Sequence, residues 1–289
     1  MNPAFFPPRK LPQPAPTSVV GLVVSDVTNP FFAEVIPAIE ECLDVAGFTT
    51  LLGNTSEDCT REARLLKTMR EFPPTGVLIC PSFGHDGLSA QPLRLIGRLP
   101  TVAFARPAGG LDYVGVNNVY GAELAVDHLY QNGHRKIAFV GGEPQALATQ
   151  ERLEGYQRAL TRRDLPIELR WMVPSSPSRC GGYRNTASLL ELENPPTAAV
   201  CFNDLVAFGL VQALQQAGRK PGAEFGVIGF NDVPVILDSY PLLTTVDTSP
   251  RQLGEVAAEL LLRRIAKPDS LLQKVILQPQ LIVRHSCGC

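Results

Sequence analysis

Short apolar runs alternate with longer amphipathic stretches from Ser18 to about residue 117. The apolar runs are SVVGLVVS, FTTLLG, GVLICP and PTVAFAR, and the amphipathic stretches include FAEVIPAIEECLDVAG and CTREARLLKTMREF. Continuous β-branched runs separated by helical patterns are typical of a parallel sheet covered by helices on both faces. This part of the chain is therefore predicted to form a doubly wound α/β lobe.

A second series with the same alternation follows. Its apolar runs are KIAFVGG, RWMVPS, TAAVCFND and EFGVIGFND, and its helical stretches include GAELAVDHLYQNG and LVAFGLVQALQQAG. Gly47, Gly133 and Gly218 each follow a predicted helix, where a left-handed C-cap favours glycine. We expect an α/β protein with two doubly wound parallel-sheet lobes, and a ligand in the crevice between the carboxyl ends of their strands.

The alternation changes after residue 243. A strand LLTTVD, a helix from Ser249 to about Lys267 and one long final strand KVILQPQLIVRHS are predicted. Ser249, Pro250 and Gln252 match a capping box with proline at the first helical position. These elements are too few for a third domain, so we expect them to return to the two lobes, with several chain crossings and a hinge.

The predicted boundaries follow from these elements. The N-terminal lobe is assigned residues 18–117 and 247–273, and the C-terminal lobe residues 118–246 and 274–289. Residues 1–17 are rich in proline, which favours extended segments over packed structure, and are predicted to form a leader or linker.

Composition narrows the class of protein. The 289 residues are 45% hydrophobic and 19% charged, which is ordinary for a globular protein. The net charge is −2 and no run of five Lys or Arg occurs, so the chain as given offers no electrostatic footprint for nucleic acid. It has no apolar stretch long enough to span a membrane and no secretory h-region, so we expect a cytoplasmic protein without membrane contact.

Cofactor and catalytic signals are lacking. The seven cysteines are an odd number and several lie inside apolar runs, which favours reduced, buried thiols. Cys287 and Cys289 form a close pair without a second Cys/His pair at ligand spacing, so no metal is expected. No phosphate loop, dinucleotide fingerprint, zincin helix or nucleophile elbow occurs, so neither a cofactor nor an enzymatic activity is predicted. The histidines are scattered at positions His85, His128, His134 and His285.

Two phenylalanines stand side by side at the first helix start, in DVTNPFFAEV. Asn29 is a favoured N-cap and Pro30 a favoured first helical residue. Phe32 falls in the apolar stripe of this helix, whereas Phe31 lies about 100° away. Phe32 is therefore predicted to anchor the helix, and Phe31 to lie at the crevice as an apolar wall for a ligand ring. Simple packing of Phe31 on neighbouring loops is the alternative.

Six motifs between residues 18 and 286 carry a family resemblance. In chain order they are VVGLVVSDVTNPFFAEV, NGHRKIAFVGG, ERLEGYQRAL, CFNDLVAFGLVQAL, VIGFND and LTTVDTSPRQLGEVAAELLLRRI. Together they resemble the effector-binding core of the lactose/galactose repressor family of bacterial transcription regulators. The resemblance implies a type I periplasmic-binding-protein fold, a homodimer, and a small effector, a sugar or related polar metabolite, held between the lobes. Operator DNA would be bound only through an N-terminal helix-turn-helix, which is not found in this sequence.

The resemblance also implies site residues in the first lobe and at the start of the second. Phe31 and Phe32 match the aromatic pair that follows the first strand, beside Asn29. Arg106 matches the arginine of a frequent Asp-Arg pair, although Ala105 replaces the aspartate. Arg152 matches an arginine that commonly grips ligand hydroxyls or carboxylate, with a surface ion pair as the alternative.

Asparagines at strand ends complete the implied site. Asn203 matches a polar ligand residue, with Asp204 expected to cap the next helix. Asn231 stands where the family usually has an aspartate, and Asn117 is a weaker candidate. Ala146 and Ala148 replace polar contacts, so one wall of the pocket is expected to be less polar.

Three further expectations remain. Carboxylates at strand ends could serve a glycosidase, although a sugar-binding cleft uses the same groups as hydrogen-bond acceptors; these are Asp26, Asp204 and Asp232. An exported solute-binding protein of a transporter shares the implied fold and is the alternative function. The apolar run LGEVAAELLL, with helices of the first lobe, is predicted to supply a dimer face.

Overall fold

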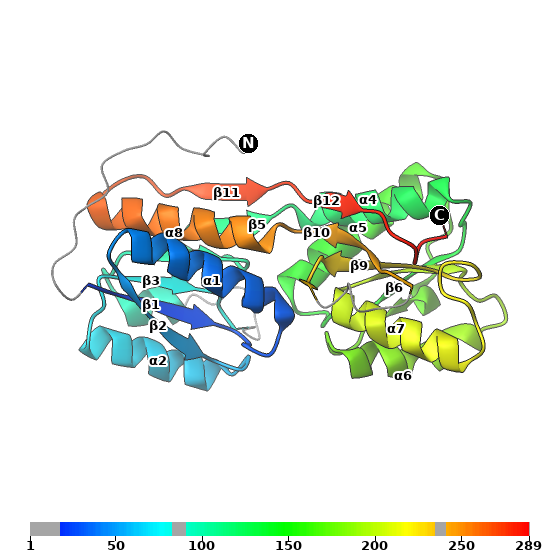
Figure 1. The fold of residues 1–289 in the computed structure, drawn as a ribbon, viewed down its shortest axis with the longest axis horizontal. Coiled ribbons are helices and arrows are strands. Elements are labelled where there is room, and N and C mark those ends of the chain that lie inside the picture. The colour runs from blue at the N-terminus through cyan, green and yellow to red at the C-terminus, as the bar shows by residue number, and fades with distance from the viewer. Residues whose placement is uncertain (1–17, 83–90, 235–240, 289) are drawn as a thin grey trace. The chain divides into compact units, whose positions relative to one another are not determined.

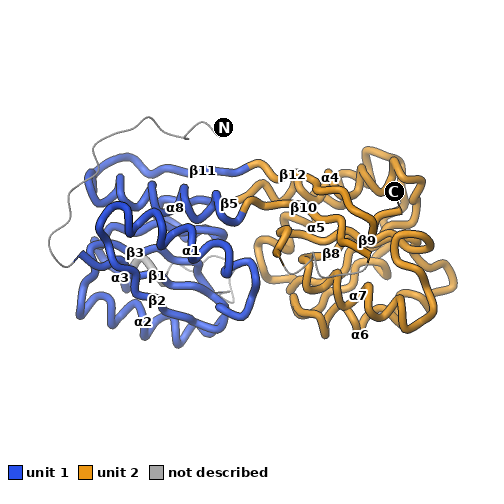
Figure 2. Tube along the Cα trace, viewed as in Figure 1, with its two compact units in different colours: residues 1–115, 250–277 blue, residues 116–249, 278–289 orange. Residues whose placement is uncertain are grey.

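The computed structural model describes residues 18–82, 91–234 and 241–288 (Figure 1). The chain forms two compact units, one of residues 1–115 and 250–277 (unit 1) and one of residues 116–249 and 278–289 (unit 2), shown in Figure 2. The chain therefore passes between the units three times. Three short segments differ from the predicted lobes, because residues 116–117 and 247–249 belong to unit 2 and residues 274–277 to unit 1.

Unit 1 is built on a six-stranded sheet in the order β11-β5-β4-β3-β1-β2. Strands β1 to β5 pair in parallel. Helices α1 and α8 pack together on one side of the sheet, and α2 packs with α3 on the other (Figure 1). The bounds are β1 (Val19–Val24), α1 (Pro30–Val45), β2 (Thr49–Asn54), α2 (Cys59–Glu71), β3 (Gly76–Ile79), α3 (Gln91–Ile96), β4 (Thr101–Phe104), β5 (Asp112–Val116), α8 (Pro250–Ala266) and β11 (Lys274–Leu277).

Unit 2 repeats the arrangement with the order β12-β10-β9-β8-β6-β7. Only β12 runs antiparallel to its neighbour among the described pairings. The bounds are α4 (Asn118–Gln131), β6 (Ile137–Val140), α5 (Leu147–Arg162), the 3-10 helix η1 (Leu169–Trp171), β7 (Met172–Val173), α6 (Arg179–Leu190), β8 (Ala198–Cys201), α7 (Asp204–Gln216), β9 (Gly226–Asn231), β10 (Thr244–Asp247) and β12 (Gln280–Ile282). The predicted class, α/β with two doubly wound lobes, is confirmed.

The end of the chain differs from the prediction in two respects. KVILQPQLIVRHS forms two strands in different sheets, β11 and β12, because Pro279 interrupts the run and cannot donate to a strand ladder. Helix α8 begins at Pro250 as predicted, but the prediction of a capping box is wrong. Ser249 has a left-handed φ of 50°, and its hydroxyl donates to the Asp247 carboxylate instead of capping the helix.

The apolar run of α8 is part of the core of unit 1. Leu253, Leu260 and Leu261 are buried where α8 packs on α1, β3 and β4. A Cβ at Gly76 would lie 3.0 Å from Leu261 Cδ1, which shows how closely helix and strand pack. The predicted dimer face is therefore wrong for these residues, because their own unit already covers them. Within the described ranges, no helix has the length and apolarity needed to cross a membrane.

The cysteines agree only partly with the prediction. The six that the structure describes are free thiols. Cys80, Cys201 and Cys287 are buried, whereas Cys180, in the first turn of α6, is exposed. Cys289 and His85 lie outside the described residues. No group of three or more potential metal ligands occurs in the described part of the chain.

Candidate functional site

The first helix start is built around Asn29, as predicted. Asn29 Oδ1 accepts the Phe31 N–H at 3.1 Å, and the helix begins at Pro30. Phe32 is buried with its ring edge-on to Phe104 at 6.5 Å. Phe31 is only 8% exposed, because its ring packs edge-on against Phe32 at 5.3 Å. Phe31 is therefore largely buried against Phe32, and its role as an apolar wall for a ligand ring stays a prediction.

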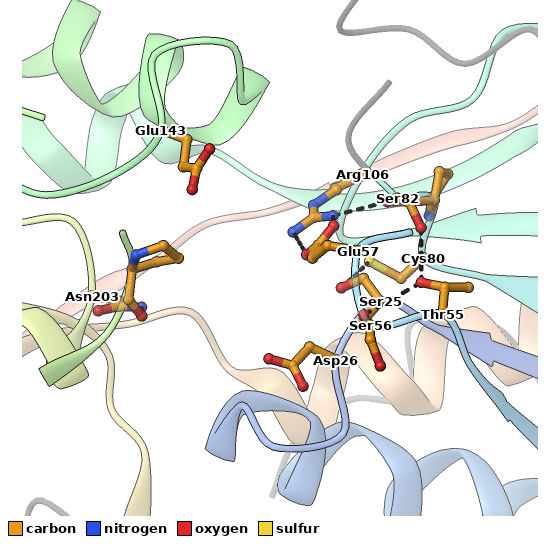
Figure 3. Close-up of polar contacts among 12 residues, drawn as sticks. Ser25, Asp26, Thr55, Ser56, Glu57, Cys80, Ser82, Arg106, Glu143 and Asn203 are labelled. Carbon is orange, nitrogen blue, oxygen red and sulfur yellow. Dashed lines mark hydrogen bonds and ion pairs between the residues drawn. The ribbon is translucent and has the colours of Figure 1, made fainter. Parts of the chain in front are cut away.

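Arg106 is held by a carboxylate that the sequence analysis did not single out. Its Nη2 and Nη1 atoms each lie 2.8 Å from an oxygen of Glu57, and Nη1 also donates to the Pro81 carbonyl at 2.9 Å (Figure 3). The side chains are 23% and 30% exposed, respectively. Glu57 follows β2 and Arg106 follows β4, so a distant loop supplies the carboxylate that Ala105 lacks. No local pattern around Glu57 signals this contact.

Buried polar groups lie beneath this ion pair. The Thr55 and Ser82 hydroxyls are 2.7 Å apart, and Thr55 Oγ1 donates to the Ser25 carbonyl at 3.3 Å (Figure 3). Glu62 Oε2 accepts the Ser82 N–H at 2.5 Å, and burial raises the pKa of this carboxyl group. These contacts tie together the loops that follow β1, β2 and β3.

Arg152 lies in the interior of unit 2, on the second turn of α5. Its Nε donates to Asn118 Oδ1 at 2.9 Å and its Nη1 to the Phe202 carbonyl. The guanidinium stacks on the Phe230 and Phe202 rings, with Cζ 3.7 and 4.7 Å from their centroids. Burial lowers the pKa of Arg152 to about 9, so it stays protonated at neutral pH. Within the described residues it forms no ion pair, and Nη2 has no acceptor, so the surface ion-pair alternative is wrong.

The N-terminus of α5 also lacks side-chain partners. The N-cap position is held by Ala146, which makes no side-chain cap. Thr149 is buried, and its hydroxyl has no hydrogen-bond partner in the described part of the chain. Thr149 and Arg152 are three residues apart and therefore share a helix face. Ala146 thus offers the first amides of α5 no side-chain acceptor, whereas its carbonyl accepts the Thr149 and Gln150 N–H groups.

Asn203, rather than Asp204, caps helix α7. Its Oδ1 accepts the Val206 N–H at 2.9 Å, and its Nδ2 donates to the Pro177 carbonyl at 3.1 Å. The predicted cap at Asp204 is wrong because that residue already lies in the first helical turn. Both ends of the Asn203 amide are used within unit 2.

Asp204 is a buried structural carboxylate. It is 1% exposed and accepts the Thr245 hydroxyl at 2.5 Å and the Val233 N–H at 3.0 Å. Burial raises its pKa to about 7. Asp232 forms an ion pair with Arg284 at 2.8 Å, and Asp26 accepts from Thr28. The three carboxylates considered for a glycosidase are therefore engaged in structural contacts.

Asn231 and Asn117 differ in their surroundings. Asn231 ends β9 with a φ of 110°, followed by Asp232 at 56°, and such strained backbone often marks a functional site. The Asn231 side-chain amide has no hydrogen-bond partner among residues the structure describes. Asn117 instead caps α4, accepting the Tyr120 N–H at 3.1 Å and donating to Gln278 Oε1 at 3.1 Å.

The predicted site residues gather at the carboxyl edges of the two sheets. In unit 1 they follow β1 and β4. In unit 2, Arg152 and Asn203 follow β6 and β8, and Asn231 ends β9. Asn117 follows β5, on the segment that enters unit 2. These edges are where parallel α/β sheets bind ligands. That one ligand contacts both edges stays a prediction.

Comparison with known proteins assigns the family. The model of the periplasmic binding protein-like domain matches residues 126–287. The HTH-type transcriptional repressor PurR of Mannheimia succiniciproducens is 32% identical, over 93% of this chain and 81% of that protein. The transcription regulator CcpA of Lactococcus lactis has a TM-score of 0.86 at 25% identity, covering 94% of this chain and 99% of that structure. A LacI family transcriptional regulator from Enterococcus faecalis, solved with bound ribose, has a TM-score of 0.82 at 31% identity, with coverage of 94% and 99%. The chain therefore belongs to the lactose/galactose repressor family of transcriptional regulators and has the periplasmic-binding-protein-like fold of their effector-binding core.

Proposed function

We propose that this chain senses a small sugar-like effector and controls the DNA-binding output of a transcriptional repressor. The effector binds at the carboxyl edges of the sheets, with Arg152 and Asn231 as its contacts in unit 2. Binding changes the relation between the lobes, and this change reaches operator DNA through an N-terminal helix-turn-helix domain. A regulator of this kind works in the cytoplasm and needs no cofactor or catalytic group.

The burial of Arg152 with one unused donor is the observation that carries the proposal. A buried guanidinium is costly unless its charge and donors are compensated. In Arg152, Nε and Nη1 donate hydrogen bonds, and the guanidinium stacks on the Phe202 and Phe230 rings. Its Nη2 has no acceptor in the described chain. A bound hydroxyl or carboxylate would supply that acceptor, and the planar fork suits bidentate contacts.

Two further observations support the same site. The Asn231 amide, which can donate and accept, has no partner among the described residues and sits on strained backbone. The Enterococcus faecalis regulator, which shares this fold, holds ribose. A polyhydroxylated ligand of similar size suits these donors and acceptors.

A ligand screen by thermal unfolding tests the proposal. The panel contains D-ribose, other pentoses and hexoses, cellobiose, nucleosides and sugar phosphates. A specific effector at 100 times its Kd should raise the free energy of unfolding by about 2.7 kcal/mol, because it binds only the folded protein. Calorimetry of the best hit then gives the stoichiometry. A panel in which no compound shifts unfolding or gives binding heat would contradict the proposal.

We also propose that the protein is a homodimer, through a surface that differs from the α8 run. Strand β2 is the edge of the unit 1 sheet, and Leu51 and Leu52 on it are 58% and 49% exposed. Unit 1 also exposes Val45 and Phe72, which end or follow helices α1 and α2. An edge strand with exposed leucines is a natural pairing surface for a second copy.

A further inference from the structure

Left-handed backbone at three positions accompanies the contact between Glu57 and Arg106. Ser56 and Glu57 have left-handed φ values of 52° and 58°, and Ala105, directly before Arg106, has 58°. Residues other than glycine rarely adopt such backbone conformations. These conformations persist where the surrounding structure holds them. Two separate loops are therefore strained at the points from which this carboxylate and this guanidinium project.

The ion pair spans the middle of the sheet edge. Strands β2 and β4 are not neighbours, because β1 and β3 lie between them in the order β4-β3-β1-β2. Glu57 follows β2 and reaches Arg106 after β4, so the pair crosses over the carboxyl ends of β1 and β3 (Figure 3). This is the part of an α/β sheet edge where ligands bind.

The groups beneath the pair fix its position. Thr55, which precedes the strained loop, is fastened to Ser82 and to the Ser25 carbonyl, and Pro81 accepts from Arg106. Both oxygens of Glu57 are oriented by the guanidinium at 2.8 Å. A carboxylate oxygen can accept more than one hydrogen bond, and the Glu57 side chain is 30% exposed. Its orientation is thus set before any ligand arrives.

We propose that Glu57, oriented by Arg106, accepts hydroxyl groups of the effector on the unit 1 side and so determines its specificity. This inference rests on the proposed effector function. Because Glu57 neutralises Arg106, the pair offers no net positive charge to a phosphate or carboxylate and favours an uncharged polyol at this end of the ligand.

Calorimetry with matched ligands and variants tests this role. D-ribose and the other unphosphorylated sugars of the panel are titrated first, and the tightest binder is compared with its monodeoxy analogues. We expect Glu57→Gln, which keeps the shape but loses the charge, to weaken the parent sugar at least tenfold. Glu71→Gln, an exposed residue at the end of α2, is the control and should leave affinity unchanged.

The deoxy analogues separate a direct contact from a structural effect. In the wild type, one analogue should bind at least tenfold more weakly than the parent sugar. In Glu57→Gln that loss should shrink by at least fivefold, because a neutral amide replaces the charged acceptor of the missing hydroxyl. If every analogue lost the same affinity in both proteins, the role of Glu57 would be overturned, whereas the proposed function would stand. Tighter binding of a sugar phosphate than of its parent sugar would overturn the proposed selectivity. A wild type that binds no sugar of the panel would overturn both the role of Glu57 and the proposed function.

Discussion

Asp112 and Arg264 form a bidentate ion pair although 152 residues separate them in the sequence. Arg264 Nε and Nη2 lie 2.7 and 2.9 Å from the two Asp112 carboxylate oxygens. Asp112 begins β5 and also accepts the Gln273 N–H, whereas Arg264, near the end of α8, also donates to the carbonyls of Pro268 and Ser270. The pair fastens the returning segment of unit 1 to the sheet formed by the first part of the chain.

Removing the charge of Asp112 should strongly destabilise unit 1. Asp112→Asn leaves the Arg264 guanidinium buried without its counter-ion, which we expect to cost about 3 kcal/mol in the free energy of urea unfolding. Glu154→Gln, which removes a partner of the exposed Arg158 pair, should change stability by less than about 0.5 kcal/mol. Equal small losses for both variants would show that the buried pair contributes little.

The apolar run of α8 should behave as core and not as an interface. Leu261 is fully buried, whereas Leu271, five residues beyond the end of the helix, is 89% exposed. We expect Leu261→Ala to lower the free energy of unfolding by about 2–5 kcal/mol, because it leaves a cavity. Leu271→Ala should change it by less than about 0.5 kcal/mol. A Leu261→Ala variant that dissociates without losing stability would restore the dimer-face interpretation.

Asp204 should give stability an unusual pH dependence. Its pKa is raised to about 7, so the folded state holds this proton more tightly than the unfolded chain. The associated stability is present below about pH 4 and is lost as the pH rises through about 7, with an upper estimate of about 4 kcal/mol. Asp204→Asn cannot ionise, so its stability relative to the wild type should improve between pH 4 and 8. Denaturant titrations at each pH measure the difference, and a difference that is constant with pH would contradict the prediction.

Effector binding should require the planar guanidinium of Arg152 and not only its positive charge. Lysine at this position keeps the charge but cannot bond Asn118, the Phe202 carbonyl and a ligand together. We expect Arg152→Lys to weaken the effector found in the thermal screen by at least tenfold, about 1.4 kcal/mol. Arg158→Lys, on an exposed part of the same helix, is the control. Unchanged affinity in calorimetry would remove Arg152 from the site.

The edge strand β2 should decide the oligomeric state. We expect the double variant Leu51→Ser/Leu52→Ser to sediment as a monomer at tens of micromolar, where the wild type sediments as a dimer, because burial of exposed leucines drives association. Leu169→Ser changes a leucine that is 82% exposed in unit 2 and should leave the dimer intact. A monomeric wild type would end the dimer proposal, and a dimeric double variant would exclude this surface.

The alternation of apolar runs and amphipathic stretches was sufficient to predict the fold. Buried parallel strands are apolar throughout, and helices that cover them are apolar on one side only, so both leave a local pattern. Local chemistry also predicted the cap at Asn29, the helix start at Pro250 and the left-handed glycines at positions 47, 133 and 218. These features depend on residues within a few positions of each other.

Only the tertiary structure decided which side chains from distant segments meet. Whether Phe31 is exposed depends on the angle at which its ring meets Phe32. Glu57 reaches Arg106 across two intervening strands, and Asp112 meets Arg264 from the other end of the chain. A contact between distant segments depends on strand order and loop conformation, and neither leaves a periodic trace in the sequence. The sequence therefore determined where the candidate site residues lie along each sheet edge, whereas folding determined their partners.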